Sequence, residues 1–355
     1  MNTPSVQTLN LTDLDSLDDA QLSGLRWKEL QCFNGRLLEL HAEGLLDNEF
    51  SAKLPRKPIL CIDKIEVLNE ERIEASFTFP ANASDWPYAI DEALEMLFQD
   101  QLDQLVGFWA ARKINGIGRA LSSGACTLHQ SLNFEPAKQV LFVLEKRKWM
   151  ENSSTGTGTA VFNAKIQDTS GQLLLETRNV IVGILNPQDI QELRKQYGGQ
   201  QGVKEPSSTD KPSNLRVPVF DNDPGSITGS DGVYNREATQ VINPDLWPLR
   251  YHFRGDPVVP GNFGTHGMIA LLKDSARDDF GLKNPVFKSL SRKSFSGMIF
   301  EDPKQIRFKL INISQNDAGD VVAEEAGLYL EDSQGNALIE APIYTFKNLT
   351  VTESV

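Results

Sequence analysis

Apolar residues recur along the chain with two kinds of spacing. Apolar positions three or four residues apart predict helices at about 18–46, 90–113 and 263–279. Runs rich in Val, Ile, Leu and Phe, bounded by turn residues, predict β-strands. Such runs come before and after the second predicted helix, and again before and after the third.

This order of elements occurs twice, which predicts two similar units. We expect an N-terminal extension with an amphipathic helix at 1–50, a first unit at 51–186 and a second at 231–355. Between the units, residues 187–230 are rich in Gln, Gly, Ser, Pro and Lys and predict a linker. One helix wrapped by one antiparallel sheet is a stable way to build a core. We therefore expect an α+β fold in which two such units pair as a pseudo-dimer.

Composition and charge narrow the choice of partners. The chain has 355 residues, of which 40% are hydrophobic, with a formal net charge of −13. This acidity opposes binding to nucleic acid, which needs a positive surface. No apolar run is long enough for a membrane span, and the N-terminus lacks the pattern of a secretory signal. Three widely spaced cysteines indicate no disulfide framework, and a reducing cytoplasm is expected.

Two small basic clusters interrupt this acidity, at 146–148 and at Arg292–Lys293. Since charged residues mostly lie at surfaces, we expect both clusters to be solvated strand ends.

A specific motif lies at residues 242–268, which read INPDLWPLRYHFRGDPVVPGNFGTHGM. This segment resembles the signature of the bacterial 3-hydroxydecanoyl-ACP dehydratase family, an Asn-Pro-Asp-Leu-Trp entry followed by His-Phe-x-Gly-Asp-Pro-Val-x-Pro-Gly. The resemblance implies that His252 is a general base and that the backbone N–H of Gly261 is an oxyanion donor. It places Asn262 beside that donor, with Phe253 and Pro260 as loop support.

The chemistry of the motif agrees with these roles. Removal of a proton from C2 of a thioester builds negative charge on the carbonyl oxygen, and N–H groups at a helix N-terminus point toward such charge. Glycine lets a ligand approach the backbone, and a neutral histidine can take up a proton.

The second half departs from the family at one position. The family's acid stands fourteen positions after its histidine, where this chain has His266. The first half carries a matching segment, DQLDQLVGFWAARKINGIGRALSSG at residues 100–124, which resembles the family's central helix and following strand. The resemblance places the acid at Asp100, with Asp103 as a rival and Gln104 as tunnel support. The first half has no histidine at the position of the base.

One half therefore keeps the acid and the other keeps the base. In the family, each site lies between two subunits, so one composite site of His252 and Asp100 is expected here. The whole resembles the double hotdog dehydratase regions of polyunsaturated fatty acid and polyketide synthases, over residues 55–185 and 235–350. The second pseudo-site, around Trp86 and His266, is expected to be inactive.

The resemblance implies dehydration of (3R)-3-hydroxyacyl thioesters, carried on the phosphopantetheine of an acyl carrier protein, to trans-2-enoyl thioesters. It implies no metal or redox cofactor, an acyl tunnel beside the central helices, and other synthase domains as further partners. Asp256 is expected to hold the histidine loop through side-chain to backbone bonds. Arg119 is expected near the interface of the two halves.

Several alternatives stay open at this point. A hotdog thioesterase would share the fold, and a decayed dehydratase would serve as a carrier-protein scaffold. The same two residues could also move a double bond. The sequence leaves open the acyl length, the oligomeric state, any role of His266, and whether the chain stands alone or belongs to a larger synthase.

Overall fold

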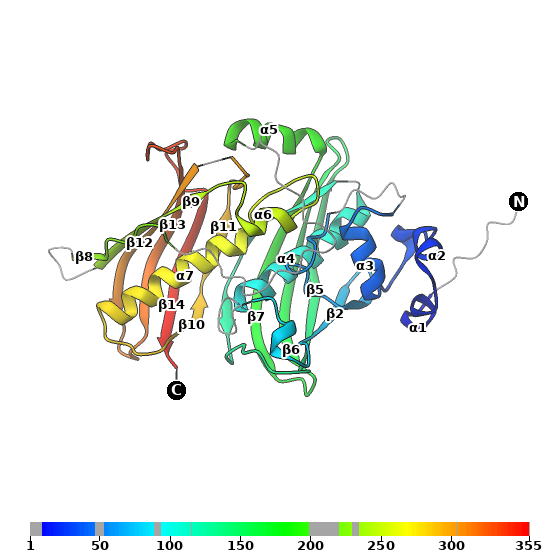
Figure 1. Cartoon of the computed structure of the whole chain (residues 1–355), viewed down its shortest axis with the longest axis horizontal. Coiled ribbons are helices and arrows are strands. Elements are labelled where there is room, and N and C mark those ends of the chain that lie inside the picture. The colour runs from blue at the N-terminus through cyan, green and yellow to red at the C-terminus, as the bar shows by residue number, and fades with distance from the viewer. Residues whose placement is uncertain are drawn as a thin grey trace, which may run out of the picture.

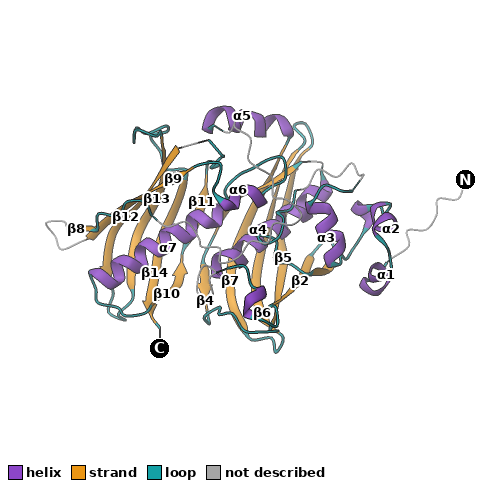
Figure 2. Ribbon diagram, viewed as in Figure 1, coloured by secondary structure: helices purple, strands orange, loops and turns teal. Residues whose placement is uncertain are grey.

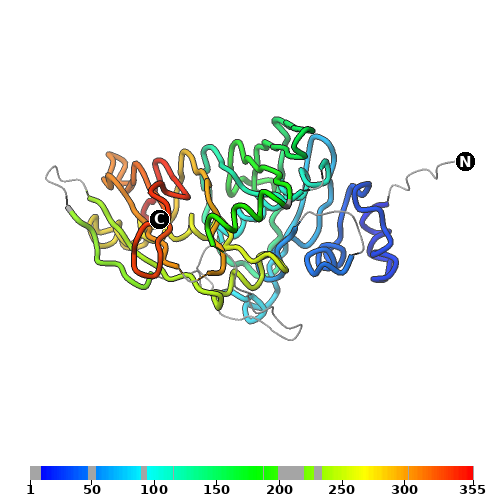
Figure 3. The backbone as a smooth tube through the Cα atoms, turned by 90° about the horizontal axis from the view of Figure 1, so that it is seen from above, coloured from blue at the N-terminus to red at the C-terminus, as the bar shows by residue number. Residues whose placement is uncertain are grey.

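The chain folds into two lobes that lie end to end in the computed structural model, with an N-terminal extension at the outer end of the first lobe (Figures 1 and 3). Each lobe has one long helix against one face of a curved antiparallel sheet (Figure 2). The structure describes residues 9–46, 53–88, 94–114, 116–198, 220–228, 234–302 and 304–354.

The first lobe is built around α4 (Leu94–Lys113), which is buried along nearly its whole length. In β6 every second residue is buried, so that one face of the strand packs on α4 and the other faces outward. The strands of this lobe are β1 (Lys64–Leu68), β2 (Arg72–Thr78), β3 (Ile117–Ser123), β4 (Cys126–Leu128), β5 (Gln139–Asn152), β6 (Thr157–Asp168) and β7 (Leu173–Leu185).

The second lobe repeats this plan around α7 (Gly261–Asp278). Its strand β12 alternates buried and half-buried residues over most of its length. The strands are β8 (Ser226–Thr228), β9 (Tyr234–Ile242), β10 (Pro285–Leu290), β11 (Arg292–Phe295), β12 (Lys304–Gln315), β13 (Val321–Glu331) and β14 (Tyr344–Glu353).

The two sheets join into one sheet at the junction of the lobes. Strand β3 pairs with β11, where Ser123 lies opposite Lys293, and β4 pairs with β10, where Cys126 lies opposite Leu290. The strand order is β1-β2-β5-β6-β7-β3-β11-β14-β13-β12-β9-β8, and α4 packs beside α7. This is the expected α+β double hotdog, a pseudo-dimer within one chain.

The N-terminal extension differs from the single helix predicted at 18–46. Side-chain caps from Asn10, Asp18 and Asn34 each start a separate short helix. Its elements are α1 (Leu11–Asp15), α2 (Asp19–Ser23), a 3-10 turn (Trp27–Glu29) and α3 (Gly35–Ala42). Polar capping residues therefore divide a stretch that apolar spacing alone joins into one helix.

The extension docks on the first lobe through aromatic side chains. The Phe33 ring meets the Phe108 ring of α4 edge-on at 5.1 Å, and it also lies 5.4 Å from the Trp27 ring. A backbone bridge joins Phe33 to Ile65 of β1. The extension thus covers the outer edge strand of the sheet, which would otherwise expose unpaired backbone groups.

The segment predicted as a linker, 187–230, is partly regular. Helix α5 (Pro187–Tyr197) begins at a capping box formed by Asn186 and Asp189, with proline in its first turn. Strand β8 also lies in this range. Residues 199–219 and 229–230 lie outside the described part of the chain. The caps and the proline favour a helix here despite the polar composition.

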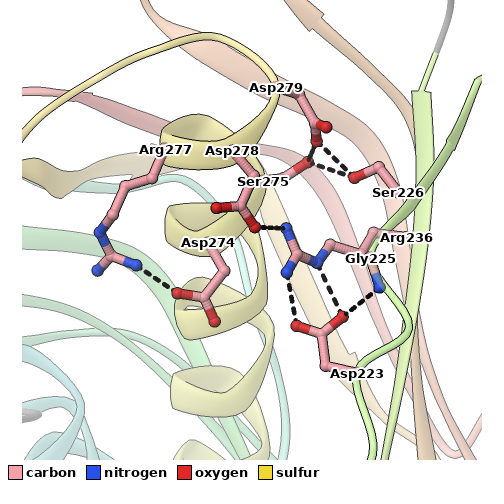
Figure 4. Close-up of polar contacts among 9 residues, drawn as sticks. All are labelled: Asp223, Gly225, Ser226, Arg236, Asp274, Ser275, Arg277, Asp278 and Asp279. Atoms are coloured by element: carbon pink, nitrogen blue, oxygen red, sulfur yellow. Dashed lines mark hydrogen bonds and ion pairs between the residues drawn. The ribbon is translucent and has the colours of Figure 1, made fainter.

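A polar cluster ties the outer edge of the second lobe to the end of α7 (Figure 4). Arg236 of β9 is 4% exposed and donates twice to Asp223, at 2.6 and 3.0 Å, and once to Asp278 of α7 at 2.8 Å. The Ser226 hydroxyl lies 3.1 Å from that of Ser275. These bonds hold the edge hairpin against the helix.

Candidate active site

The histidine motif forms a tight loop between α6 (Trp247–Tyr251) and α7. The Phe253 and Asp256 backbones bond to each other in both directions, and Gly255 takes the positive φ of 64° that this turn requires. The Val258 N–H then donates to the His252 carbonyl at 2.7 Å. The loop closes on itself and fixes the backbone of His252.

The imidazole of His252 is held in one tautomer. Its Nδ1 lies 2.9 Å from the Val258 carbonyl oxygen, which can only accept, so Nδ1 carries the hydrogen. The other nitrogen, Nε2, lies 2.9 Å from the Gln104 amide nitrogen on α4 and accepts from it. The residue is 5% exposed, and burial lowers the pKa of His252 to about 4. The ring is therefore neutral at physiological pH and presents a basic Nε2 toward the other lobe.

Asp100 lies one turn before Gln104 on α4 and is 2% exposed. Its Oδ2 has no hydrogen-bond partner among the described residues. Burial first, and the charge of Asp103 second, raise the pKa of Asp100 to about 7. The carboxyl can therefore hold a proton near neutral pH, as an acid catalyst requires.

The rival carboxyl, Asp103, has a different environment. Its Oδ2 accepts from the Asn262 amide at 2.8 Å and lies 3.9 Å from the Lys293 ammonium. Burial raises the pKa of Asp103, and Lys293 opposes this rise. Because these donors already engage the Asp103 oxygen, Asp100 is the better placed of the two to donate a proton to a ligand.

One cavity between the lobes brings most of the predicted residues together. His252, Phe253 and Gly261 line it from the second lobe, and Asp100, Asp103 and Gln104 line it from the first. The cavity measures about 70 Å³, enough for the reacting end of a small ligand and too little for a long acyl chain.

Pro260 and Asn262 are not among the residues that line this cavity. Pro260 is the N-cap of α7, and Asn262 is buried behind the cavity beside Asp103.

Gly261 is the first residue of α7, and the helix has no side-chain cap. The N–H groups of a first helical turn have no partner within the helix, so the Gly261 N–H can donate to a ligand. A Cβ built on Gly261 would lie 3.3 Å from the Phe295 ring. Glycine therefore also suits the close packing here.

The prediction for Asp256 was wrong about its bonding. Instead of backbone bonds, its carboxylate pairs with Arg194 of α5 at 2.5 Å and with Lys53 at 2.9 Å. Burial alone would raise the pKa of Asp256, but Lys53 and Arg194 hold it below its usual range. Arg194 also binds Glu301 at 3.0 Å. The histidine loop is thus held by charged residues distant in sequence, which the local motif could not reveal.

The prediction that Arg292 and Lys293 are both solvated was wrong for Lys293, which is 1% exposed. Arg292 is exposed, since neighbouring residues of a strand point to opposite faces. The alternation of inward and outward side chains along a strand could have predicted the burial of Lys293 from the sequence. It places Lys293 inside the protein next to the candidate site.

His266 is half-buried on α7 and is not among the residues that line the cavity. Desolvation lowers the pKa of His266 to about 3. The first-lobe segment that would face it runs from Trp86 into residues 89–93, which lie outside the described part. Arg119 of β3 lies at the interface of the lobes, as predicted, and donates to the Gly297 carbonyl at 3.2 Å.

The described residues hold no group of three or more His, Cys, Asp or Glu side chains able to bind a metal. Across the same residues, no helix combines the length and apolarity needed to span a membrane.

Comparison with known families gives one match, at residues 227–334, to the model of the FabA-like domain. The second lobe is similar to the FabA-like domain, and it is called the FabA-like lobe below for this similarity. The match includes the histidine motif and the start of α7. It covers under half of the chain, and the first lobe lies outside it.

Several solved structures resemble the FabA-like lobe and its partner lobe together. The dehydratase domain of RzxB from Pseudomonas fluorescens has 9% identity and a TM-score of 0.41, covering 79% of this chain and 94% of that one. The 12:0-ACP thioesterase from Umbellularia californica has 8% identity and a TM-score of 0.42, covering 79% and 93%. A conserved hypothetical protein from Mycobacterium tuberculosis, described as a double hotdog, has 11% identity and a TM-score of 0.42, covering 75% and 84%.

Proposed function

We propose that the chain dehydrates (3R)-3-hydroxyacyl thioesters on an acyl carrier protein to trans-2-enoyl thioesters. One observation carries this proposal. A single cavity holds a neutral imidazole, His252, from the FabA-like lobe and a buried carboxyl, Asp100, from the first lobe. A base and an acid of this kind are the two groups that removal of water requires.

In the proposed reaction, Nε2 of His252 takes the C2 proton of the thioester. The developing charge on the thioester oxygen is stabilised by the Gly261 N–H at the start of α7. Asp100 gives its proton to the C3 hydroxyl, and the C3–O bond breaks to release water. The chain is then left with an imidazolium and a carboxylate, and one proton exchanged through water restores both groups.

Gln104 connects the two groups in this scheme. Its amide donates to Nε2 of His252, and its hydrogen bonding lowers the pKa of Asp100 slightly against the effect of burial. It therefore orients the base toward the acid before a substrate enters.

The proposal extends to the substrate's delivery. The acyl chain would be carried on phosphopantetheine, with no metal or redox cofactor, in the cytoplasm and near other synthase domains. Because the cavity is small, a long acyl chain would need the tunnel beside α4 and α7 to open. Movement of the double bond by the same two residues remains a second candidate outcome at this site.

A thioesterase fits the site less well. It would need an ionised carboxylate as base or nucleophile, whereas burial keeps Asp100 protonated up to about pH 7. The second carboxyl that lines the cavity, Asp103, already accepts a hydrogen bond from Asn262 and lies 3.9 Å from the Lys293 ammonium, so its Oδ2 is engaged. A scaffold without activity has no need of a buried acid and base in one cavity.

The test is a dehydration assay on a 3-hydroxyacyl thioester, scored by mass loss of one water. We expect His252→Ala and Asp100→Asn each to lower kcat/KM by at least about 100-fold, because each removes a general catalyst. His266→Ala should stay within about threefold of the unmodified chain. Hydrolysis of the thioester in place of dehydration, or full activity of Asp100→Asn, would overturn the proposal.

A further inference from the structure

Lys293 is a buried cation whose contacts all lie at the junction of the two lobes. Its ammonium donates to the Gln99 side-chain oxygen of α4 at 2.8 Å and to the Asn262 side-chain oxygen of α7. It lies 3.9 Å from Oδ2 of Asp103. It does not line the cavity, so it does not touch a ligand there.

The hydrogen-bond partners around Lys293 fix the orientation of the Asn262 side-chain amide. An ammonium only donates, so it fixes the side-chain oxygen of Asn262 toward itself. The Asn262 nitrogen must then point the other way, where it donates to Asp103 at 2.8 Å. The Oδ2 atom of Asp103 accepts this bond and lies 3.9 Å from the Lys293 ammonium. Both contacts favour the ionised form of Asp103.

Beyond the effect of burial, Asp100, one helical turn away, is affected more by the charge of Asp103, which raises its pKa, than by either Asn262 or Lys293, which lower it. Its Oδ2 has no partner in the described chain, and the charge of Asp103 disfavours a second charge at this site. Two neighbouring carboxyls in a buried site share their protons as a pair. The position of the cation then decides which of the two is ionised.

We propose that Lys293 is a positioning residue that fixes the negative charge on Asp103 and thereby leaves the pair's proton on Asp100. This inference deepens the proposed dehydration, because it explains how the acid stays protonated next to a second carboxyl.

Among the described residues, no other cation contacts Asp103, and Lys53, which lines the same cavity, is paired with Asp256 at 2.9 Å. Burial raises the pKa values of the cysteines and tyrosines involved, so they are neutral, and His252 is neutral as well. Arg119 bonds to main-chain carbonyls across the lobe interface. The described titratable and charged groups facing the pair besides Lys293 are Lys53, Cys61, Tyr88, Arg119, Cys126, His252 and Tyr344.

The test follows the titration of Asp100 directly in the full chain, by NMR of side-chain carboxyls labelled with carbon-13, with Asp100→Asn to assign the signal. In Lys293→Met, the cation that holds the charge on Asp103 is lost. The Asp103 midpoint should therefore rise by about 1–3 pH units, and the two carboxyls should share the last proton, so that both signals titrate over the same range. In Asp103→Asn, the unpaired ammonium remains, and the Asp100 midpoint should fall. The double variant should lie between the two single variants.

The matched control is Arg292→Met, which removes the exposed neighbouring cation and should leave both midpoints unchanged. A folded Lys293→Met chain in which the Asp103 midpoint moves by less than about half a unit, and Asp100 alone still keeps the last proton, would overturn the inference. If Lys293→Met does not fold, an unchanged or raised Asp100 midpoint in Asp103→Asn overturns it instead.

The alkaline limb of kcat/KM should follow the same order among the variants. If the unmodified chain proves inactive on hydroxyacyl thioesters, the proposed function fails, and the NMR titration still decides the role of Lys293.

Discussion

At the scale of single residues, burial acts in opposite directions on the two reacting groups. The neutral form of His252 is uncharged and the protonated form of Asp100 is uncharged, so a dry cavity favours both. These are the forms that abstraction of a proton and protonation of a leaving hydroxyl need. One physical cause therefore prepares the base and the acid together.

This predicts the pH dependence of the reaction. The depressed pKa of His252, about 4, means that the base is available above that pH. The raised pKa of Asp100, about 7, means that the acid is available below it. We expect kcat/KM for dehydration to form a bell between about pH 4 and pH 7, followed by enoyl absorbance in buffers of constant ionic strength. Activity that keeps rising above pH 8 would contradict Asp100 as the acid.

At the scale of elements, the histidine loop depends on a helix from the segment between the lobes. Arg194 of α5 joins Asp256 of the loop to Glu301, and its guanidinium lies 4.5 Å from the centre of the Phe300 ring. Figure 1 shows α5 above the junction of the lobes. This helix therefore positions the loop from outside the lobe that contains it.

Arg194→Met should accordingly weaken catalysis without removing either reacting group. It leaves Asp256 with Lys53 alone and Glu301 without this partner, so the loop loses its fixed position. We expect kcat/KM to fall by about 10- to 100-fold, since misplacement by about 1 Å has effects of this size. Lys195→Met, an exposed change on the same helix, is the control and should be neutral. Equal activity of both variants, measured well below their Tm, would show that α5 does not position the loop.

The cluster at the end of α7 predicts a difference in stability between two arginines. Arg236→Met leaves the Asp223 carboxylate, itself largely buried, without its bidentate partner and should lower the free energy of unfolding by about 3 kcal/mol. Arg277→Met removes an exposed pair with Asp274 and should cost less than about 1 kcal/mol. Urea unfolding of both variants would measure the difference. Similar values for the two would show that Arg236 does not hold the hairpin to the helix.

Elements with strong local signals were predictable from sequence, and contacts between distant segments were not. The helices α4 and α7 and most strands follow from apolar spacing, and the motif at 242–268 led to the His252 loop. The helix α5 was missed because its composition is polar. Arg194 and Lys53 were missed because ion pairs across the fold leave no local pattern. Lys293 was misjudged because a charged residue is expected outside unless its partners are known.

At the scale of the whole molecule, each lobe contributes one of the two proposed reacting groups. The base and Gly261 come from the FabA-like lobe, and the acid and Gln104 come from the first. The lobes are joined by backbone pairing in a single sheet. The proposed composite site therefore has both of its reacting groups within one chain.

This arrangement predicts that two inactive chains cannot rescue each other. Co-expression of His252→Ala with Asp100→Asn should give only the sum of their separate activities, because each chain keeps both of its own lobes together. Purification with two different tags would confirm that both variants are present. Recovery of activity in the mixture would mean that lobes of different chains combine.

The pairing of β3 with β11 and of β4 with β10 also has a consequence for synthesis on the ribosome. The first lobe emerges with one edge of its junction strands β3 and β4 unpaired, since their other edge pairs with β7. Strand β10 begins only at Pro285, far beyond the end of β4 at Leu128. At ordinary translation rates, that interval lasts roughly 8 to 30 seconds. During it, the nascent lobe presents an open strand edge and the polar side of α4, a state that invites pairing with a neighbouring nascent chain. We therefore expect chaperones to bind mainly the first half of this protein during its synthesis.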